Sequence, residues 1–364
     1  MRRAYKNCRV FLNGRFENRG FAVSDGVITD YIEGEEAVDL HGDMIIPGLI
    51  DIHTHGRSGL DLMQTTPEQV LEMKACYAKK GVTTVVPTLD SAPLDEMVNK
   101  VAELSRLGFP AAHVEGRYIN PKKKGAHNEK FLAPPAACEV ELFAKAAGDM
   151  HLHFSSAFEL DEDGSFLKAI VDHGYTASIA HTTATYAEAM DLVDKGVRSF
   201  THLFNTMPQI HHRDGGCVAA GLISDAYVEI IVDEVHLAPE TVKLVKKTKD
   251  PNKVILITDS MMGTDQADGE YVIAGNPVTL KDGKAYTHEG ALAGSTLELF
   301  KAVTNYVAFT GASFEEALCA ATVNPATLLG LKGVGALDIG CRADYIILSP
   351  DLSIKEIYLG GERV

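Results

Sequence analysis

The sequence predicts an α/β fold, a (β/α)8 TIM-type barrel that carries a small β-sandwich domain formed from both chain ends. Eight apolar, β-rich runs alternate with helical segments along the middle of the chain, and this alternation is expected of a parallel sheet. Both chain ends consist of short strand-like segments and turns. The 364 residues also leave room for a large and a small domain, because single cores stop growing at about 250–300 residues.

The two ends have the same β-rich character. In the first segment, Asn13-Gly14 is a strong hairpin signal between two strand-like runs. We therefore expect the ends to build one β-sandwich beside the barrel, with a possible β-hairpin inserted late in the barrel. The predicted division is 1–43 and 335–364 for the sandwich, 44–334 for the metal-dependent barrel, and 271–290 for the hairpin.

Helical patterns separate the predicted barrel strands. Residues 66–81 and 185–196 are two of these patterns, and each closes on a glycine, as helix C termini often do. Eight strand–helix units favour a closed barrel over a doubly wound sheet. The predicted strands cover residues 44–55, 83–89, 111–116, 151–159, 175–183, 199–205, 227–236 and 253–260.

Composition and charge narrow the classes of function. A formal net charge of −16 argues against nucleic acid and anionic membranes as partners, since both attract basic surfaces. The six cysteines form no CxxC pair, so neither a disulfide framework nor a thiolate zinc site is indicated. The N-terminal residues lack the apolar stretch of a signal peptide, and no run approaches the roughly 18 apolar residues of a membrane helix. We expect a cytoplasmic protein.

Histidines and carboxylates occur where predicted strands end. His53 and His55 are two residues apart, so on a strand both side chains point the same way. A lone HxH is weak evidence for a metal, but the ends of four later strands carry further candidates, and the C-terminal ends of barrel strands converge on one rim. The later candidates are Glu115, His181, His202 and Asp259.

Such a set of side chains is suited to a divalent cation. Imidazole and carboxylate ligands suit zinc and iron among the first-row metals, and we expect one or two ions per subunit. A bound cation activates water and polarises a carbonyl, which indicates hydrolysis of an amide or ester. Asp259 is the candidate general base and then acid, and it could also be a metal ligand.

Successive motifs resemble those of N-acetylglucosamine-6-phosphate deacetylases in the amidohydrolase superfamily. They cover most of the chain in the order found in that family, which is more specific than any one motif. The matching segments are PGLIDIHTHG (47–56), HVEGRYINPKKKGAHN (113–128), THLFNTM (201–207), HHRDGG (211–216), ITDSM (257–261) and LAGST (292–296).

The resemblance implies the reaction and the metal ligands. A metal-activated hydroxide would attack the acetyl carbonyl of N-acetyl-D-glucosamine 6-phosphate, giving D-glucosamine 6-phosphate and acetate, with Asp259 as the acid/base. His127 would help to polarise the carbonyl. Glu115 would join His181 and His202 around one metal, and it would be shared with a second metal at the pair His53 and His55.

The resemblance also implies how the sugar phosphate is held. Arg213 would bind the phosphate of a neighbouring active site in a homodimer, which suits the paired hydrogen bonds of a guanidinium. The lysines at 122–124 would steer an anionic substrate toward the site. The remaining substrate-binding positions are Asn205, Thr206, His236, Leu292, Ala293 and Gly294, together with His127.

Four positions depart from the usual family motifs, and none of them removes a proposed ligand. Arg117 and Glu234 are expected to bring charge near the pocket and so to affect substrate preference. The other two departures are Phe158 and Ala180.

Three alternatives remain open. The substrate could be the galactosamine epimer, since a sequence does not display the pocket that reads one hydroxyl group. Cyclic-amide hydrolysis, as in dihydroorotases, is less favoured because those enzymes typically bridge two metals with a modified lysine, whereas Glu115 is the bridging candidate here. A non-catalytic barrel scaffold is least favoured, because all six candidate metal-site residues are present.

Overall fold

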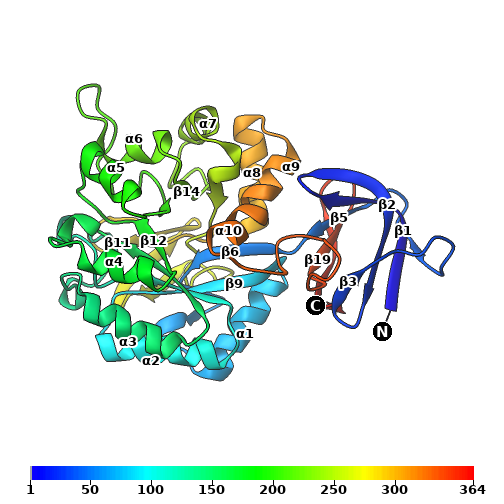
Figure 1. Cartoon of the computed structure of the whole chain (residues 1–364), viewed down its shortest axis with the longest axis horizontal. Helices are drawn as coiled ribbons and strands as arrows, with labels where there is room; N and C mark the ends of the chain where they lie inside the picture. The colour runs from blue at the N-terminus through cyan, green and yellow to red at the C-terminus, as the bar shows by residue number, and fades with distance from the viewer. Residues whose placement is uncertain (1) are drawn as a thin grey trace.

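The computed structural model describes residues 2–364, which form a barrel with a β-sheet domain at one side (Figure 1). The barrel is a parallel sheet of eight strands in the order β15-β14-β13-β12-β11-β10-β9-β6. The predicted (β/α)8 barrel with a β-sandwich domain is confirmed. The barrel strands are β6 (Leu49–Thr54), β9 (Val82–Leu89), β10 (Ala111–Glu115), β11 (His151–Ser156), β12 (Thr176–Ile179), β13 (Ser199–Phe200), β14 (Tyr227–Ile230) and β15 (Val254–Leu256).

Hydrogen bonds beyond β15 close the barrel onto β6. The amide of Asp259 donates to the carbonyl of His53 at 2.9 Å, and the amide of His55 donates to the carbonyl of Ser260 at 2.8 Å. These bonds join the first and last strand ends of the barrel. His53, His55 and Asp259 are thereby brought together by the backbone itself.

Ten α-helices are present in residues 2–364, and those that follow the barrel strands cover its outside (Figure 1). Local sequence explains where α1 and α5 begin: Thr66 and Thr185 each form a capping box with the residue three positions later. The helices are α1 (Pro67–Ala78), α2 (Leu94–Arg106), α3 (Ala137–Ala147), α4 (Ser165–Asp172), α5 (Tyr186–Asp194), α6 (Gly216–Ile223), α7 (Pro239–Thr248), α8 (Leu299–Thr310), α9 (Phe314–Ala320) and α10 (Val323–Leu328). None of them is long and apolar enough to cross a membrane.

The two chain ends lie side by side in one mixed sheet, with both termini in this domain (Figure 1). The sheet runs β21-β20-β19-β5-β1-β2-β3, and β4 pairs with β1. Its own core includes Tyr5, Phe21 and Tyr345. The strands are β1 (Arg2–Leu12), β2 (Arg15–Ser24), β3 (Val27–Thr29), β4 (Val38–Asp39), β5 (Met44–Pro47), β19 (Tyr345–Leu348), β20 (Ile354–Leu359) and β21 (Glu362–Arg363).

The chain crosses from the sheet domain into the barrel at Gly48. On the barrel side of the boundary predicted after residue 43, β5 pairs with β1 and β19 in the sheet domain. Only then does β6 begin. A Cβ atom on Gly48 would lie 2.1 Å from Oγ1 of Thr83, so the close passage of the two segments requires glycine.

The region predicted as a possible hairpin is a three-stranded antiparallel sheet, β16 (Gly269–Ile273), β17 (Asn276–Lys281) and β18 (Lys284–Thr287). The side-chain amide of Asn276 donates to the carbonyl of Ala126 at 2.7 Å. This small sheet is therefore attached to the loop that follows β10. A further short pair, β7 (Gly56–Arg57) and β8 (Leu60–Asp61), follows β6.

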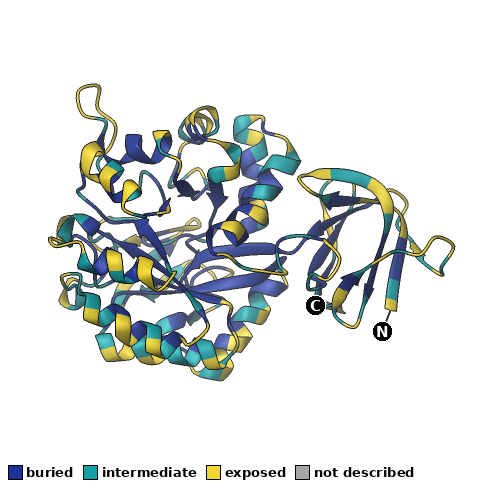
Figure 2. Cartoon of the chain, viewed as in Figure 1, coloured by how far each residue is buried: buried dark blue, intermediate teal, exposed yellow. Residues whose placement is uncertain are grey.

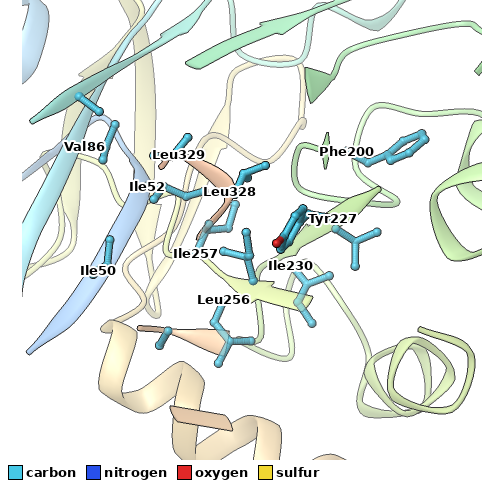
Figure 3. Close-up of a cluster of buried hydrophobic side chains, with 14 of the residues drawn as sticks. Ile50, Ile52, Val86, Phe200, Tyr227, Ile230, Leu256, Ile257, Leu328 and Leu329 are labelled. Carbon is cyan, nitrogen blue, oxygen red and sulfur yellow. The ribbon is translucent and has the colours of Figure 1, made fainter. Parts of the chain in front are cut away.

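All residues of β6 are buried, and from Ile50 to His53 its apolar and polar side chains alternate. Ile50 and Ile52 join an apolar cluster that includes Leu256 and Leu328 (Figure 3), whereas Asp51 accepts a 2.6 Å hydrogen bond from the hydroxyl of Thr258. The barrel strands are buried along most of their length, and the exposed residues lie on the outer faces of the helices and in the loops (Figure 2). The period of two thus directs Asp51 and His53 into the barrel, toward the site.

Candidate active site

The candidate ligands converge at the C-terminal ends of the barrel strands. His53 belongs to β6 and Glu115 ends β10. His181, His202 and Asp259 follow β12, β13 and β15, and their φ angles of 43°, 33° and 51° lie in the left-handed region. Such backbone costs about 1–3 kcal/mol per non-glycine residue and is concentrated at functional sites. Strained turns thus direct three of the candidate side chains onto one rim.

Glu115 lies between two clusters of ligand atoms. Its Oε2 is 3.0 Å from Nε2 of His53 and 3.1 Å from Nε2 of His55. Its Oε1 is 3.0 Å from Nε2 of His202 and 3.3 Å from Nε2 of His181. One carboxylate therefore serves both histidine pairs, with one oxygen facing each.

Asp259 completes the first cluster. Its Oδ1 lies 3.4 Å from Nε2 of His53 and 3.3 Å from Nε2 of His55. The side chain of Asp259 is 13% exposed, compared with 2% for Glu115. Asp259 is thus the acidic group of the cluster that a substrate or water can reach.

The spacing of these atoms fits a cation in each cluster. The Nε2 atoms of His53 and His55 are 3.2 Å apart, as are those of His181 and His202. Ligands about 2.0–2.1 Å from a tetrahedral cation lie about 3.3–3.4 Å from each other. The donor sets of buried imidazoles and a carboxylate are also those that zinc and iron accept. Both His53–His55–Asp259 and Glu115–His181–His202 have the spacing of candidate metal sites.

Electrostatics in the cluster depends on burial and close opposite charges. Burial lowers the pKa of His53, but the charges of Glu115 and Asp259 outweigh it and raise the pKa to about 10. Burial raises the pKa of Asp259, but the neighbouring His53 and His55 bring it below its usual value. Positive charge is therefore strongly stabilised between these carboxylates, whether a proton or a metal ion supplies it.

A cavity of ≈ 250 Å³ opens above the clusters. His127 lies in its wall, with Nδ1 3.1 Å from the hydroxyl of Ser91 and Nε2 4.0 Å from Oε2 of Glu115. Burial, together with the nearby His181, lowers the pKa of His127 to about 4. The imidazole is therefore neutral at pH 7 and can present an N–H group to a ligand in the cavity.

Most of the predicted substrate-binding residues line the same cavity. The exceptions are Ala293, which is fully buried beside it, and Arg213. Leu292 and Gly294 reach the cavity from the segment that follows β18. The other predicted residues in the lining are Asn205, Thr206 and His236.

Arg213 lies away from the cavity of its own chain. It occupies an exposed loop between β13 and α6 that protrudes from the barrel at the upper left of Figure 2. Its guanidinium contacts Nε2 of His212 at 2.7 Å, and Ile210 in the same loop is 47% exposed. The structure of a single chain thus does not bring Arg213 to the predicted ligands.

Arg117 and Glu234, which were expected to bring charge near the pocket, do not line this cavity. The guanidinium of Arg117 pairs with Glu139 of α3 at 3.3 Å. Glu234 is exposed on the loop after β14. The departures Phe158 and Ala180 are buried apolar residues. These four positions therefore add no charge to the cavity wall.

Three buried residues at the site were missed from the sequence. Asp90, directly after β9, has Oδ1 2.8 Å from Nδ1 of His55. Ser91 contacts His127 as described above. Glu229, within β14, has Oε1 3.1 Å from Nε2 of His153. Asp90 could have been found because it follows a barrel strand directly, as the other candidate ligands do. A charged residue inside the apolar run of β14 was a signal for Glu229.

Comparison with known proteins relates the whole chain to deacetylases. Residues 44–364 match the amidohydrolase family. The N-acetylgalactosamine-6-phosphate deacetylase of Escherichia coli O157:H7 is 30% identical over 362 residues, covering 96% of this chain and 95% of that protein. The N-acetylglucosamine-6-phosphate deacetylase of Bacillus subtilis (strain 168) is 32% identical over 327 residues, covering 85% of this chain and 82% of that protein.

A solved structure extends the similarity to the fold. The N-acetyl-D-glucosamine-6-phosphate deacetylase of Mycobacterium smegmatis, solved as an aspartate-to-alanine variant with N-acetyl-D-glucosamine-6-phosphate, has a TM-score of 0.93 and 27% identity to this chain. The match covers 100% of this chain and 99% of that structure. Both the barrel and the sheet domain therefore have counterparts in that protein.

Proposed function

This chain belongs to the amidohydrolase family, and from that premise we propose that it hydrolyses N-acetyl-D-glucosamine 6-phosphate to D-glucosamine 6-phosphate and acetate. The main support for the proposal is that Glu115 lies between the two histidine pairs at the base of a cavity, with one of its oxygens facing each pair. Relatives at 30–32% identity are deacetylases of amino-sugar phosphates.

The residues divide into those that would hold a cation and those that act on the substrate. Zinc or iron would be held by the two clusters that share Glu115. When bound, such a cation lowers the pKa of water and polarises a carbonyl. His53 and His55 with Asp259, and His181 with His202, supply the remaining donor atoms.

Asp259 carries the proton in this proposal. Its accessible carboxylate takes a proton from the attacking water as the new C–O bond forms at the acetyl carbon. The same carboxyl group then donates that proton to the amine nitrogen as the amide C–N bond breaks. The immediate products are acetic acid and a free amino group, which at pH 7 become acetate and an ammonium group by transfer of the remaining proton, so atoms and charge balance without another reactant.

His127 would orient the acetyl group and stabilise its oxygen. The neutral ring contacts the hydroxyl of Ser91 through Nδ1, so the ring is held with its other nitrogen available. An N–H donor aimed at the developing oxyanion stabilises the transition state more than the ground state. The donor acts from a buried position, where water competes weakly.

The phosphate and the sugar would be held at the outer part of the cavity. Asn205, Thr206 and His236 are among the residues that line the cavity, and Nδ1 of His236 contacts Oδ2 of Asp233 at 2.7 Å. We propose that Arg213 binds the phosphate in the neighbouring subunit of a homodimer, because its loop protrudes from the barrel. The enzyme would act in the cytoplasm.

A second candidate substrate is N-acetyl-D-galactosamine 6-phosphate. It is favoured by the Escherichia coli relative, which is named for that epimer and matches 96% of this chain. The two substrates differ in the orientation of one hydroxyl group. The same catalytic residues would therefore act on both.

Acetate release from a panel of N-acetyl amino sugars tests the proposal. The panel contains both epimers, each with and without the 6-phosphate, and the metal content is measured on the same sample. We expect the 6-phosphates to be cleaved with a much higher kcat/KM than the free sugars. Cleavage of the free sugars alone would contradict the proposed role of Arg213, and acetate release from none of them would refute the proposed reaction.

A further inference from the structure

The outer nitrogens of the first histidine pair both face buried carboxylates. When Nε2 of an imidazole binds a cation, its ring proton is on Nδ1, and an acceptor near Nδ1 fixes the ring orientation. Among the described residues 2–364, Nδ1 of His53 and Nδ1 of His55 are buried and have no aligned hydrogen-bond partner. The groups near these two Nδ1 atoms therefore determine how well the rings of His53 and His55 are held in a metal-binding orientation.

Asp90 lies beside His55. Its Oδ1 is 2.8 Å from Nδ1 of His55, at ion-pair distance but not aligned as a hydrogen bond. Its Oδ2 accepts a 3.2 Å hydrogen bond from the amide of Ala274, in the turn between β16 and β17. Asp90 is 2% exposed. A small rotation of either group would align the pair, while the bond to Ala274 keeps the carboxylate in place.

Glu229 lies beneath His53 in the barrel. Its Oε2 is 4.0 Å from Nδ1 of His53, and both atoms are buried without a hydrogen-bond partner. Its other oxygen is held by Nε2 of His153 at 3.1 Å. Two complementary atoms left unpaired in the same buried space are costly, and pairing them removes both costs.

The second cluster lacks this arrangement. Nδ1 of His181 donates to the backbone carbonyl of Lys123 at 2.7 Å, and Nδ1 of His202 has no partner. A carboxylate makes an imidazole a stronger donor to a metal than a neutral carbonyl does. Among the described residues, buried carboxylates therefore lie close to Nδ1 of both histidines in the pair at the end of β6, His53 and His55.

We propose that Asp90 and Glu229 are positioning residues that hold His55 and His53 in the orientation that binds a cation together with Glu115 and Asp259. They act through the two rings and not as ligands of the cation. The inference rests on the proposed function only in that a cation occupies the site. If Asp90 and Glu229 have this role, the cluster of His53, His55 and Asp259 is a second cation-binding site of this chain.

Cation binding to metal-free protein tests this role directly. The chelator-treated full chain is titrated with Zn²⁺ to obtain the number of sites and their affinities, and with Co²⁺ to record the absorption bands of each site. We expect two cations per chain in the wild type. In Asp90→Ala and Glu229→Gln, the cation at Glu115, His181 and His202 is retained, and the other binds about 10–100-fold more weakly, with altered Co²⁺ bands.

Asp233→Asn is the matched control, because Asp233 also pairs with a histidine on the same rim, His236, outside both clusters. It should bind both cations as the wild type does. If Glu229→Gln does not fold, Asp90→Ala carries the test, since Asp90 lies at the cavity wall.

Wild-type affinity at both sites in the variants, or a single site in the wild type, overturns the proposal. Equal weakening at both sites also overturns it, because that result indicates a merely structural role. Failure of the proposed function is distinguishable: the wild type would bind two cations and the variants would bind one of them more weakly, while no N-acetyl amino sugar released acetate.

Discussion

Replacement of Asp259 by asparagine removes the ability of this side chain to transfer a proton while keeping its size and shape. Asparagine occupies the same volume and keeps an oxygen near His53 and His55, which lie 3.4 and 3.3 Å from Oδ1 of Asp259. It cannot accept and return a proton. General acid–base catalysis contributes about 10²–10⁴-fold, and each factor of ten corresponds to about 1.4 kcal/mol. We therefore expect kcat to fall by that factor, a loss of about 3–5 kcal/mol of transition-state stabilisation.

The assay is acetate release at saturating substrate, with metal content and thermal unfolding measured on the same preparation. The cation at Glu115, His181 and His202 should remain, because Asp259 is not part of that cluster. KM should change little, since the substrate still enters the same cavity. Near-normal kcat in a metal-loaded Asp259→Asn protein would refute the assignment of the acid/base.

Four further changes test other parts of the account. His127→Ala should lower kcat about 10²–10³-fold through loss of one oxyanion donor, measured by acetate release; an unchanged kcat would remove His127 from the mechanism. Arg213→Ala should raise KM for the 6-phosphates and leave cleavage of unphosphorylated sugars as it is, and an equal effect on both would contradict phosphate binding. Phe154→Ala, in a fully buried contact with Phe143 and Phe166, should cost about 3–5 kcal/mol in denaturant unfolding, and a loss below 1 kcal/mol would be inconsistent with that packing. Burial lowers the pKa of Lys249 from 10.5 to about 8, so the unfolded chain binds more protons between these values and stability should rise with pH there; Lys249→Met should flatten that rise, and an identical pH dependence in the variant would contradict it.

The candidate metal ligands could be predicted from the sequence because each of them lies at or just after the end of a barrel strand. A parallel barrel brings the C-terminal ends of its strands to one rim whatever the loop lengths are. His53, Glu115 and His202 are far apart in the chain, yet their positions after apolar runs were enough to group them. The resemblance implied that Glu115 serves both histidine pairs, and the structure adds that each of its two oxygens faces one pair, a geometry that depends on side-chain rotamers.

The division between the domains was harder to predict. Residues 44–55 have the composition of one continuous β-rich segment, and periodicity does not reveal that β5 and β6 belong to different sheets. The signal was Gly48, because only glycine permits the close approach to Thr83 at the crossing. The three strands β16, β17 and β18 span residues 269–287, compared with 271–290 for the predicted hairpin.

Buried carboxylates behind the ligands were missed for a different reason. Glu229 lies within β14, where its neighbours are apolar, and whether its side chain points into or out of the barrel depends on strand register. Asp90 directly follows β9, so its place at a strand end could have marked it as a site residue, but only the folded structure shows that it contacts His55. Side chains that orient a ligand are recognised from distances, and distances come from the folded structure.

The most direct test of the central claim is acetate release as cations are added back to metal-free protein. With N-acetyl-D-glucosamine 6-phosphate as substrate, we predict no acetate from the metal-free chain and a rise that saturates at no more than two equivalents of Zn²⁺ or Fe²⁺. Full acetate release from the metal-free chain would contradict the role given to the clusters around Glu115, and so would no release from the fully loaded chain.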